Sequence, residues 1–239
     1  MSRLFRTLVV AVLLLFACAF PALAAKSYSA DRFDVDVIVQ RDGSALVTET
    51  VTFRYEGGPF TYAFRGIPTR FTDGISDIQV SEGGRVYQPG GAQPGQVERQ
   101  DRNNEIRLTW HFPETSDMTR TFTVSYRVEG VVREDGGAAE LRWAALPTDH
   151  DYTIGSSLVT VQLPPGVSVD RASLLAGRGA LQAQGDRVIV EATDIPRNGS
   201  LTLGVWMPLR AFSNVPPAWQ AAAMADAAWA RPLQIGSAL

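Results

Sequence analysis

The segment Asp149-His150-Asp151 is the most suggestive cluster of potential metal ligands in the sequence. Imidazole and carboxylate groups bind Zn²⁺ and related ions. A structural zinc site takes four protein ligands, however, and the chain contains one other histidine, His111. We therefore expect residues 149–151 to form a solvated loop, and we expect the protein to hold no metal and no other cofactor.

Paired carboxylates could also do chemistry, because two of them suffice to hydrolyse a glycoside. Asp34 with Asp36, and Asp42 with Glu49, are such pairs. Alternate residues of a strand share a face whatever their function, so the spacing alone is weak support. Neither Gly-x-Ser-x-Gly nor His-Glu-x-x-His occurs. We expect no enzymatic activity, and a carboxylate-dependent hydrolase of glycan or peptide is the alternative.

Three residues are candidates for binding: Arg65, Tyr62 and Trp206. The planar guanidinium of Arg65 could hold a carboxylate or a phosphate, or it could form a partly buried pair with Glu49 of a neighbouring strand. The rings of Tyr62 and Trp206 could stack on sugars if they face outward. Trp206 could equally lie where two domains meet. The residues do not identify a small-molecule ligand.

β-strands must position these residues, because apolar side chains recur at every second place along most of the chain. Residues 33–39 alternate in this way, and the Asp-Gly step in the turn at 41–44 favours a hairpin with a return strand at 46–55. The same period appears at 106–110, 122–128, 141–143, 159–163, 188–190 and 201–207. About ten antiparallel strands are therefore expected, with Trp143 in the core.

Two sheets packed face to face would bury one face of each. We predict an all-β fold, an antiparallel β-sandwich. The length of the body favours two Ig-like sandwich modules in tandem, at 30–130 and 131–210, divided at the polar stretch 130–137. The Gly/Pro-rich segment 88–104 is expected to be a mobile loop.

The first 25 residues are predicted to be a signal peptide that forms a helix. Arg3 and Arg6 precede a short apolar run, and small residues follow it, so cleavage is expected after Ala24 or Ala25. Cys18 is the sole cysteine, and lipidation there is the alternative. We expect an exported bacterial protein, periplasmic or on the outer face of the cytoplasmic membrane, without a disulfide.

The carboxyl-terminal tail, 216–239, is predicted to contain an Ala-rich helix that begins after two prolines. Trp219 and Trp229 lie within one broad face of that helix, which would suit a membrane interface. Packing of the helix on the sandwich is an equal alternative. The formal net charge is −3, and no cluster of four or more Lys/Arg occurs, so a nucleic-acid partner is not expected.

Several stretches resemble the extracytoplasmic domain of the DUF2207 family of predicted bacterial membrane proteins. Those stretches are 37–44, 47–53, 64–68, 75–80, 122–128 and 141–143, and in this order they cover about residues 30–209. The resemblance implies a signal peptide, a β-rich domain outside the cytoplasm and a membrane helix after it. It implies no activity and no catalytic residue.

The sequence departs from this family pattern at two points. Residues 144–151 lack the Gly and Trp that relatives tend to carry there, and the membrane part is missing, so we expect a short member or a truncated product. We interpret the chain as a non-enzymatic binding or scaffold domain of the cell envelope. Its expected partner is another envelope protein or its own missing membrane segment.

Overall fold

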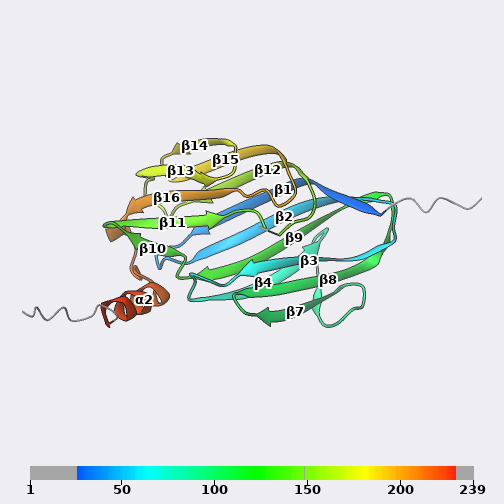
Figure 1. Cartoon of the computed structure of the whole chain (residues 1–239), viewed down its shortest axis with the longest axis horizontal. Helices are drawn as coiled ribbons and strands as arrows, with labels where there is room; N and C mark the ends of the chain where they lie inside the picture. Colours follow the sequence, from blue (N-terminus) through cyan, green and yellow to red (C-terminus); the bar gives the residue numbers. More distant parts are fainter. Residues whose placement is uncertain (1–25, 148, 230–239) are drawn as a thin grey trace, which may run out of the picture.

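The computed structural model describes residues 26–147 and 149–229, and this part of the chain is built from sixteen strands, one short 3-10 turn and one α-helix (Figure 1). The all-β sandwich prediction is confirmed. The predicted signal helix, with Cys18, Ala24 and Ala25, lies outside the described residues, as does the tail from residue 230.

One long sheet carries the fold. Its strand order is β14-β15-β12-β1-β2-β9-β4-β5. The bounds are β1 (Ser27–Val39), β2 (Ala45–Glu56), β4 (Gly74–Glu82), β5 (Arg85–Val86), β9 (Met118–Glu129), β12 (Ile154–Gln162), β14 (Ala180–Gln184) and β15 (Arg187–Ile195).

Two four-stranded sheets complete the sandwich, and Figure 1 shows both against the long sheet. One has the order β10-β11-β16-β13, and the other β3-β8-β7-β6. Their bounds are β3 (Phe60–Pro68), β6 (Gln88–Pro89), β7 (Gln96–Arg102), β8 (Glu105–Thr115), β10 (Val132–Asp135), β11 (Ala138–Ala144), β13 (Arg171–Ala176) and β16 (Thr202–Pro208).

The hairpin between β1 and β2 forms where the sequence predicts it. Gly43 adopts φ 78°, which a residue without a side chain tolerates best. The Asp42 carboxylate accepts hydrogen bonds from the backbone N–H of Ser44 at 3.0 Å and from its hydroxyl at 2.6 Å. Burial tends to raise the pKa of Asp42, but these bonds and the nearby Arg127 lower it overall. The turn is therefore fixed by its own side chains.

Alternation along the long sheet separates a buried face from an open one. Val35 and Val37 of β1 are fully buried and meet the small sheets, as do Val159 and Val161 of β12. The open face carries the intervening polar residues together with a few apolar ones, of which Ile38 is 47% exposed. Burial of one face of each sheet accounts for the period of two in the sequence.

The long sheet does not stop at the predicted boundary between modules. β1, from the first predicted module, pairs with β12, from the second, and this pair is parallel. Buried residues from both sides of residue 130 belong to one hydrophobic cluster. The tandem Ig-like division at 30–130 and 131–210 is therefore not confirmed, and the sheet is mixed rather than purely antiparallel.

The segment 88–104 differs from the predicted loop. It contains β6 and β7, and β7 pairs with β8 from Val97↔Trp110 to Arg102↔Glu105. Most side chains of β7 are polar and exposed, so the strand shows no apolar alternation. Backbone pairing with β8 holds it in the sheet.

The Ala-rich helix is confirmed as α2 (Ala218–Trp229). Asp73, which precedes β4, accepts hydrogen bonds from the N–H groups of Ala218 at 2.9 Å and Trp219 at 2.8 Å. The indole N–H of Trp219 donates to the carbonyl of Gly130 at 2.8 Å. The first turn of α2 is thus attached to the sandwich, which is the packing alternative of the prediction. Within the described residues, no helix is long and apolar enough to cross a membrane.

Candidate functional site

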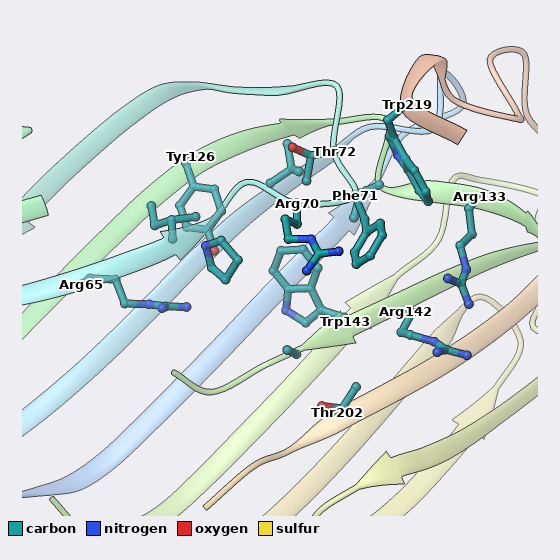
Figure 2. Close-up of a pocket in the computed structure, with 15 residues that line it drawn as sticks. Arg65, Arg70, Phe71, Thr72, Tyr126, Arg133, Arg142, Trp143, Thr202 and Trp219 are labelled. Carbon is teal, nitrogen blue, oxygen red and sulfur yellow. The ribbon is translucent and has the colours of Figure 1, made fainter. Parts of the chain in front are cut away.

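A pocket of about 340 Å³ lies between the two small sheets (Figure 2). We call it the arginine pocket because four arginines line it. The lining consists of Arg65, Ile67, Pro68, Arg70, Phe71, Thr72, Tyr126, Val128, Val131, Arg133, Arg142, Trp143, Ala144, Thr202 and Trp219. These residues come from β3 and the loop that follows it, from β9, from the segment between β9 and the end of β11, from β16 and from α2. No lining residue carries a carboxylate.

Arg65 lies at the inner wall of this pocket, and its charge is already engaged. Its Nε and Nη2 donate to the two carboxylate oxygens of Glu49 at 2.7 and 2.8 Å, and Nη1 donates to the carbonyl of Gly66. The Tyr126 hydroxyl donates to the same carboxylate at 2.7 Å. Burial opposes the charge on Arg65, yet the Glu49 carboxylate raises the pKa of Arg65 overall. Burial and, after it, Glu49 raise the pKa of Tyr126.

The pair of Arg65 with Glu49 is the structural alternative considered from the sequence. Both side chains are almost completely buried. The guanidinium therefore holds an internal carboxylate and has little capacity left for a ligand. Arg65 contributes shape to the pocket wall, and its charge is balanced by Glu49.

Arg133 and Arg142 share one buried carboxylate at the opposite wall. Glu140 is fully buried, and it accepts from Nε of Arg133 at 2.6 Å and from Nε of Arg142 at 3.3 Å. Two positive charges thus face one negative charge, and half of the Arg142 side chain is exposed. This wall keeps an excess positive charge that is accessible from solvent.

Arg70 provides further free charge at the mouth of the pocket. No ion pair of Arg70 is present within residues 26–147 and 149–229. Its guanidinium lies 4.9 Å from the centre of the Phe71 ring, and Figure 2 shows Arg70 and Phe71 on the same side of the pocket. Phe71 meets Trp219 of α2 edge-on, with 5.2 Å between the ring centres.

Trp143 forms part of the apolar wall, although the sequence placed it in the core. The side chain is half-buried and packs against the edge of the hydrophobic cluster. Its indole N–H is buried without a hydrogen-bond partner among the described residues. Trp143 therefore lies at the edge of the core, with part of its ring at the pocket.

Chemically, the arginine pocket suits an anion. Its guanidinium groups outnumber the two carboxylates that they contact, Glu49 and Glu140, and the aromatic walls offer apolar contact next to the charge. A planar guanidinium can donate two parallel hydrogen bonds to a carboxylate or a phosphate. The apolar surroundings strengthen such an interaction relative to open water.

Tyr62 lies at a different pocket, which has a volume of about 330 Å³ and is lined mainly by aromatic side chains. The ring of Tyr62 is 54% exposed, as the sugar-stacking hypothesis requires. Nearby, the Tyr28 hydroxyl donates to Asp151 at 2.5 Å, and burial and Asp151 raise the pKa of Tyr28. The structure does not bring Tyr62 and Arg65 together in one site.

Trp206 is 8% exposed and lines neither of these pockets, so the condition for sugar stacking, an outward-facing and accessible ring, is not met. Side chains from the neighbouring strands of the sheet β10-β11-β16-β13 cover the Trp206 ring. Arg171 lies over the ring at 3.7 Å from its centre, and the indole N–H donates to Asp135 at 3.0 Å. The ring also covers Gly204, where a Cβ atom would meet it at 2.5 Å. Trp206 faces away from the core, but its neighbours cover it.

His150 is buried, so the expectation of a solvated loop is wrong for this residue. Its two ring nitrogens lie 2.7 Å from the carbonyl of Tyr152 and 2.9 Å from that of Gly199. The imidazole therefore ties two loops together. Among the described residues, no group of three or more His, Cys, Asp or Glu is arranged to hold a metal ion.

The sequence analysis missed Arg70, Arg133 and Arg142 as site residues. Arg142 could have been found, because it alternates with Trp143 on a predicted strand. Arg133 lies on the short strand β10, within a polar stretch that shows no apolar alternation, and Arg70 lies in the loop after β3. Their positions in space depend on long-range packing. No local pattern indicates that these three arginines converge.

Comparison with known proteins identifies a family for this region. The family model described as the N-terminal domain of a predicted membrane protein, DUF2207, matches residues 29–207. No curated protein sequence matches the chain.

Solved structures share the fold only distantly. They include a candidate protease from Parabacteroides distasonis (10% identity, TM-score 0.45, covering 76% of this chain and 40% of that one). Leukotriene A4 hydrolase from Saccharomyces cerevisiae has 10% identity and a TM-score of 0.45, and the match covers 79% of this chain and 31% of that one. An M1 zinc metallopeptidase from Deinococcus radiodurans has 14% identity and a TM-score of 0.38, and the match covers 78% of this chain and 44% of that one. The chain spans less than half of each of these proteins, and similarity at this level carries no inference about activity.

Proposed function

The chain belongs to the DUF2207 family, as a match to the N-terminal domain of a predicted membrane protein, and from this premise we propose that it is a non-enzymatic binding domain. The domain acts outside the cytoplasm, in the periplasm or at the outer face of the cytoplasmic membrane. It holds an anionic group of its partner in the arginine pocket. The partner is another envelope protein or a membrane segment of the same protein.

One observation supports this function above the others: four arginines and no carboxylate line a partly apolar pocket. Buried arginine charge is costly unless it is paired. Glu49 and Glu140 hold Arg65 and Arg133 in place, while Arg70 and the exposed part of Arg142 stay available. This arrangement is a preformed site for negative charge.

The hydrolase alternative has less support. A glycosidase needs two carboxyl groups on either side of the bond that it cleaves. The linings of the arginine pocket and of the aromatic pocket contain none. Asp34 lies on the open face of the long sheet, where its carboxylate accepts from the N–H of Leu158 at 2.9 Å, a structural contact.

Titration with probes that differ only in the charge of the head group tests the binding function. Trp143 and Trp219 line the pocket, so their fluorescence reports binding. Octyl phosphate is expected to bind, and octyltrimethylammonium is expected not to. Arg70→Ala should weaken binding of octyl phosphate about tenfold, the equivalent of about 1.4 kcal/mol.

Arg99→Ala is the matched control, because Arg99 is exposed on β7, pairs with Asp101 and lies outside the pocket. It should bind octyl phosphate as the unchanged protein does. Equal affinity for the two probes, or an equal loss in both variants, would reject an anion site in this pocket.

A further inference from the structure

We propose that the ligand of the arginine pocket is an extended acidic peptide, which adds as a β-strand between β3 and β11. This inference rests on the proposed function and specifies its partner. The bound strand would join the two small sheets into one, across the buried face of the long sheet.

The first observation is that two strands have an open side here. β3 stands at the end of the order β3-β8-β7-β6, so within the described residues it has a strand partner on one side. β10 pairs with β11 from Ala138 to Leu141, whereas Arg142–Ala144 of β11 pair with β16 alone. Unpaired N–H and C=O groups at a sheet edge are a template for another strand. On β3 they do not include the Gly66 carbonyl, which accepts from Arg65, and Pro68 has no N–H.

The second observation is that both open edges border the same pocket. Arg65, Ile67 and Pro68 of β3 line it on one side, and Arg142, Trp143 and Ala144 of β11 line it on the other. Figure 2 shows Arg65 on the β3 side and Trp143 and Arg142 on the β11 side. A short stretch of extended backbone could therefore reach both edges at once.

The side chains around the pocket define the sequence that such a strand should have. Residues that alternate along a strand face opposite ways. The inward-facing positions of the ligand would meet the apolar floor at Ile67, Val128 and Trp143. The outward-facing positions would meet the available charges of Arg70 and Arg142. The fitting ligand therefore alternates apolar and acidic residues.

Calorimetric titration of the full chain with three synthetic pentapeptides tests this inference. The first is blocked Val-Glu-Val-Glu-Val, the second has Lys in place of both Glu, and the third is the acidic peptide with its central backbone nitrogens methylated. We expect the acidic peptide to bind at least tenfold more tightly than the other two. Methylation keeps the charges but removes backbone donors, so it separates strand addition from attraction between charges.

Two variants locate the binding. Arg142→Glu should abolish the preference for the acidic peptide over the basic one, whereas Arg99→Glu on β7 should leave it unchanged. Circular dichroism of each variant should match that of the unchanged protein, which shows that the fold persists.

The outcomes distinguish the two proposals. If the methylated acidic peptide binds as well as the unmethylated one, strand addition is wrong and the anion site stands. If octyl phosphate binds and the acidic peptide does not, strand addition is likewise wrong and the anion site stands. If neither the acidic peptide nor octyl phosphate binds better than its cationic counterpart, both proposals are wrong.

Discussion

Arg65 illustrates how a residue suited to binding serves a structural purpose. Its guanidinium makes a bidentate contact with Glu49, and Tyr126 completes the coordination of that carboxylate. The three side chains come from β3, β2 and β9, so they connect a small sheet to the long sheet through the core. A buried charge pair of this kind requires both members, because either one alone is poorly solvated.

Replacement of Arg65 is therefore expected to destabilise the fold. Arg65→Met leaves the Glu49 charge buried without its partner, and the free energy of unfolding should fall by about 3–5 kcal/mol. The double variant Arg65→Met/Glu49→Leu should recover part of this loss, since no unpaired charge remains. Urea denaturation followed by circular dichroism measures both changes. Arg99→Met, which breaks an exposed pair, should cause little change, and an equally small effect of Arg65→Met would contradict the assignment.

For individual residues, the sequence indicated which side chains could pair, but it did not indicate where in the fold they would meet. The sequence suggested the pair of Arg65 with Glu49 as a contact between neighbouring strands. The pair exists, but β3 and β2 lie in different sheets, so the contact forms across the core. The burial of Trp206 could not, since Arg171 and Asp135 reach it from strands distant in sequence. The convergence of Arg70, which lies in a loop, with the other arginines likewise depends on tertiary structure.

At the scale of elements, α2 depends on a cap from a distant segment. Helix N-termini need acceptors for their first N–H groups, and the carbonyl of Pro217 accepts from Gln220 at 3.1 Å and Ala221 at 3.0 Å. The N–H groups of Ala218 and Trp219 need a side-chain acceptor. The carboxylate of Asp73 fills this role for Ala218 and Trp219. Because Trp219 lines the arginine pocket, the position of the helix also shapes the site.

Asp73→Ala should loosen α2 and leave the sheets intact. Loss of a capping side chain lowers helix stability by about 0.5–2 kcal/mol. The effect should be concentrated in α2, because few contacts attach this helix to the sheets. Amide hydrogen exchange followed by mass spectrometry should become faster in 218–229 and stay unchanged in β1 and β2. Asp36→Ala, on the open face of the long sheet, is the control. Unchanged exchange in α2 would show that the cap does not hold the helix.

The predicted strands are those whose two faces differ in polarity, such as β1, β2 and β9. β7 was missed because most of its side chains are polar and exposed. In β4, Asp77 has a positive φ and the register with β9 shifts between Ser76 and Gln79, which breaks the alternation. Local pattern thus identifies strands that bury one face, and it fails where pairing alone holds the strand.

For the whole molecule, the parallel pair of β1 and β12 is the contact that makes one sandwich of the two predicted modules. The register Val35↔Val159 and Val37↔Val161 joins segments more than a hundred residues apart, and all four side chains are buried in one cluster. Alternation predicts that each strand buries a face, but it does not name the neighbouring strand. Alternation is therefore compatible with two separate sandwiches and with one sandwich that has a shared long sheet, and the length of the body favoured the wrong one of the two.

A shared core predicts that residues 26–229 unfold as one cooperative unit. Val161→Ala should lower the free energy of unfolding by about 1–3 kcal/mol, because it removes buried methyl groups next to β1. Hydrogen exchange at increasing urea should give the same midpoint for peptides from β8 and β9 as for peptides from β12 and β15, and the substitution should shift both midpoints equally. Two independent sandwiches would give two midpoints, with a shift confined to residues 131–210. Coincident shifts are expected because the contact removed by the substitution belongs to both halves of the chain.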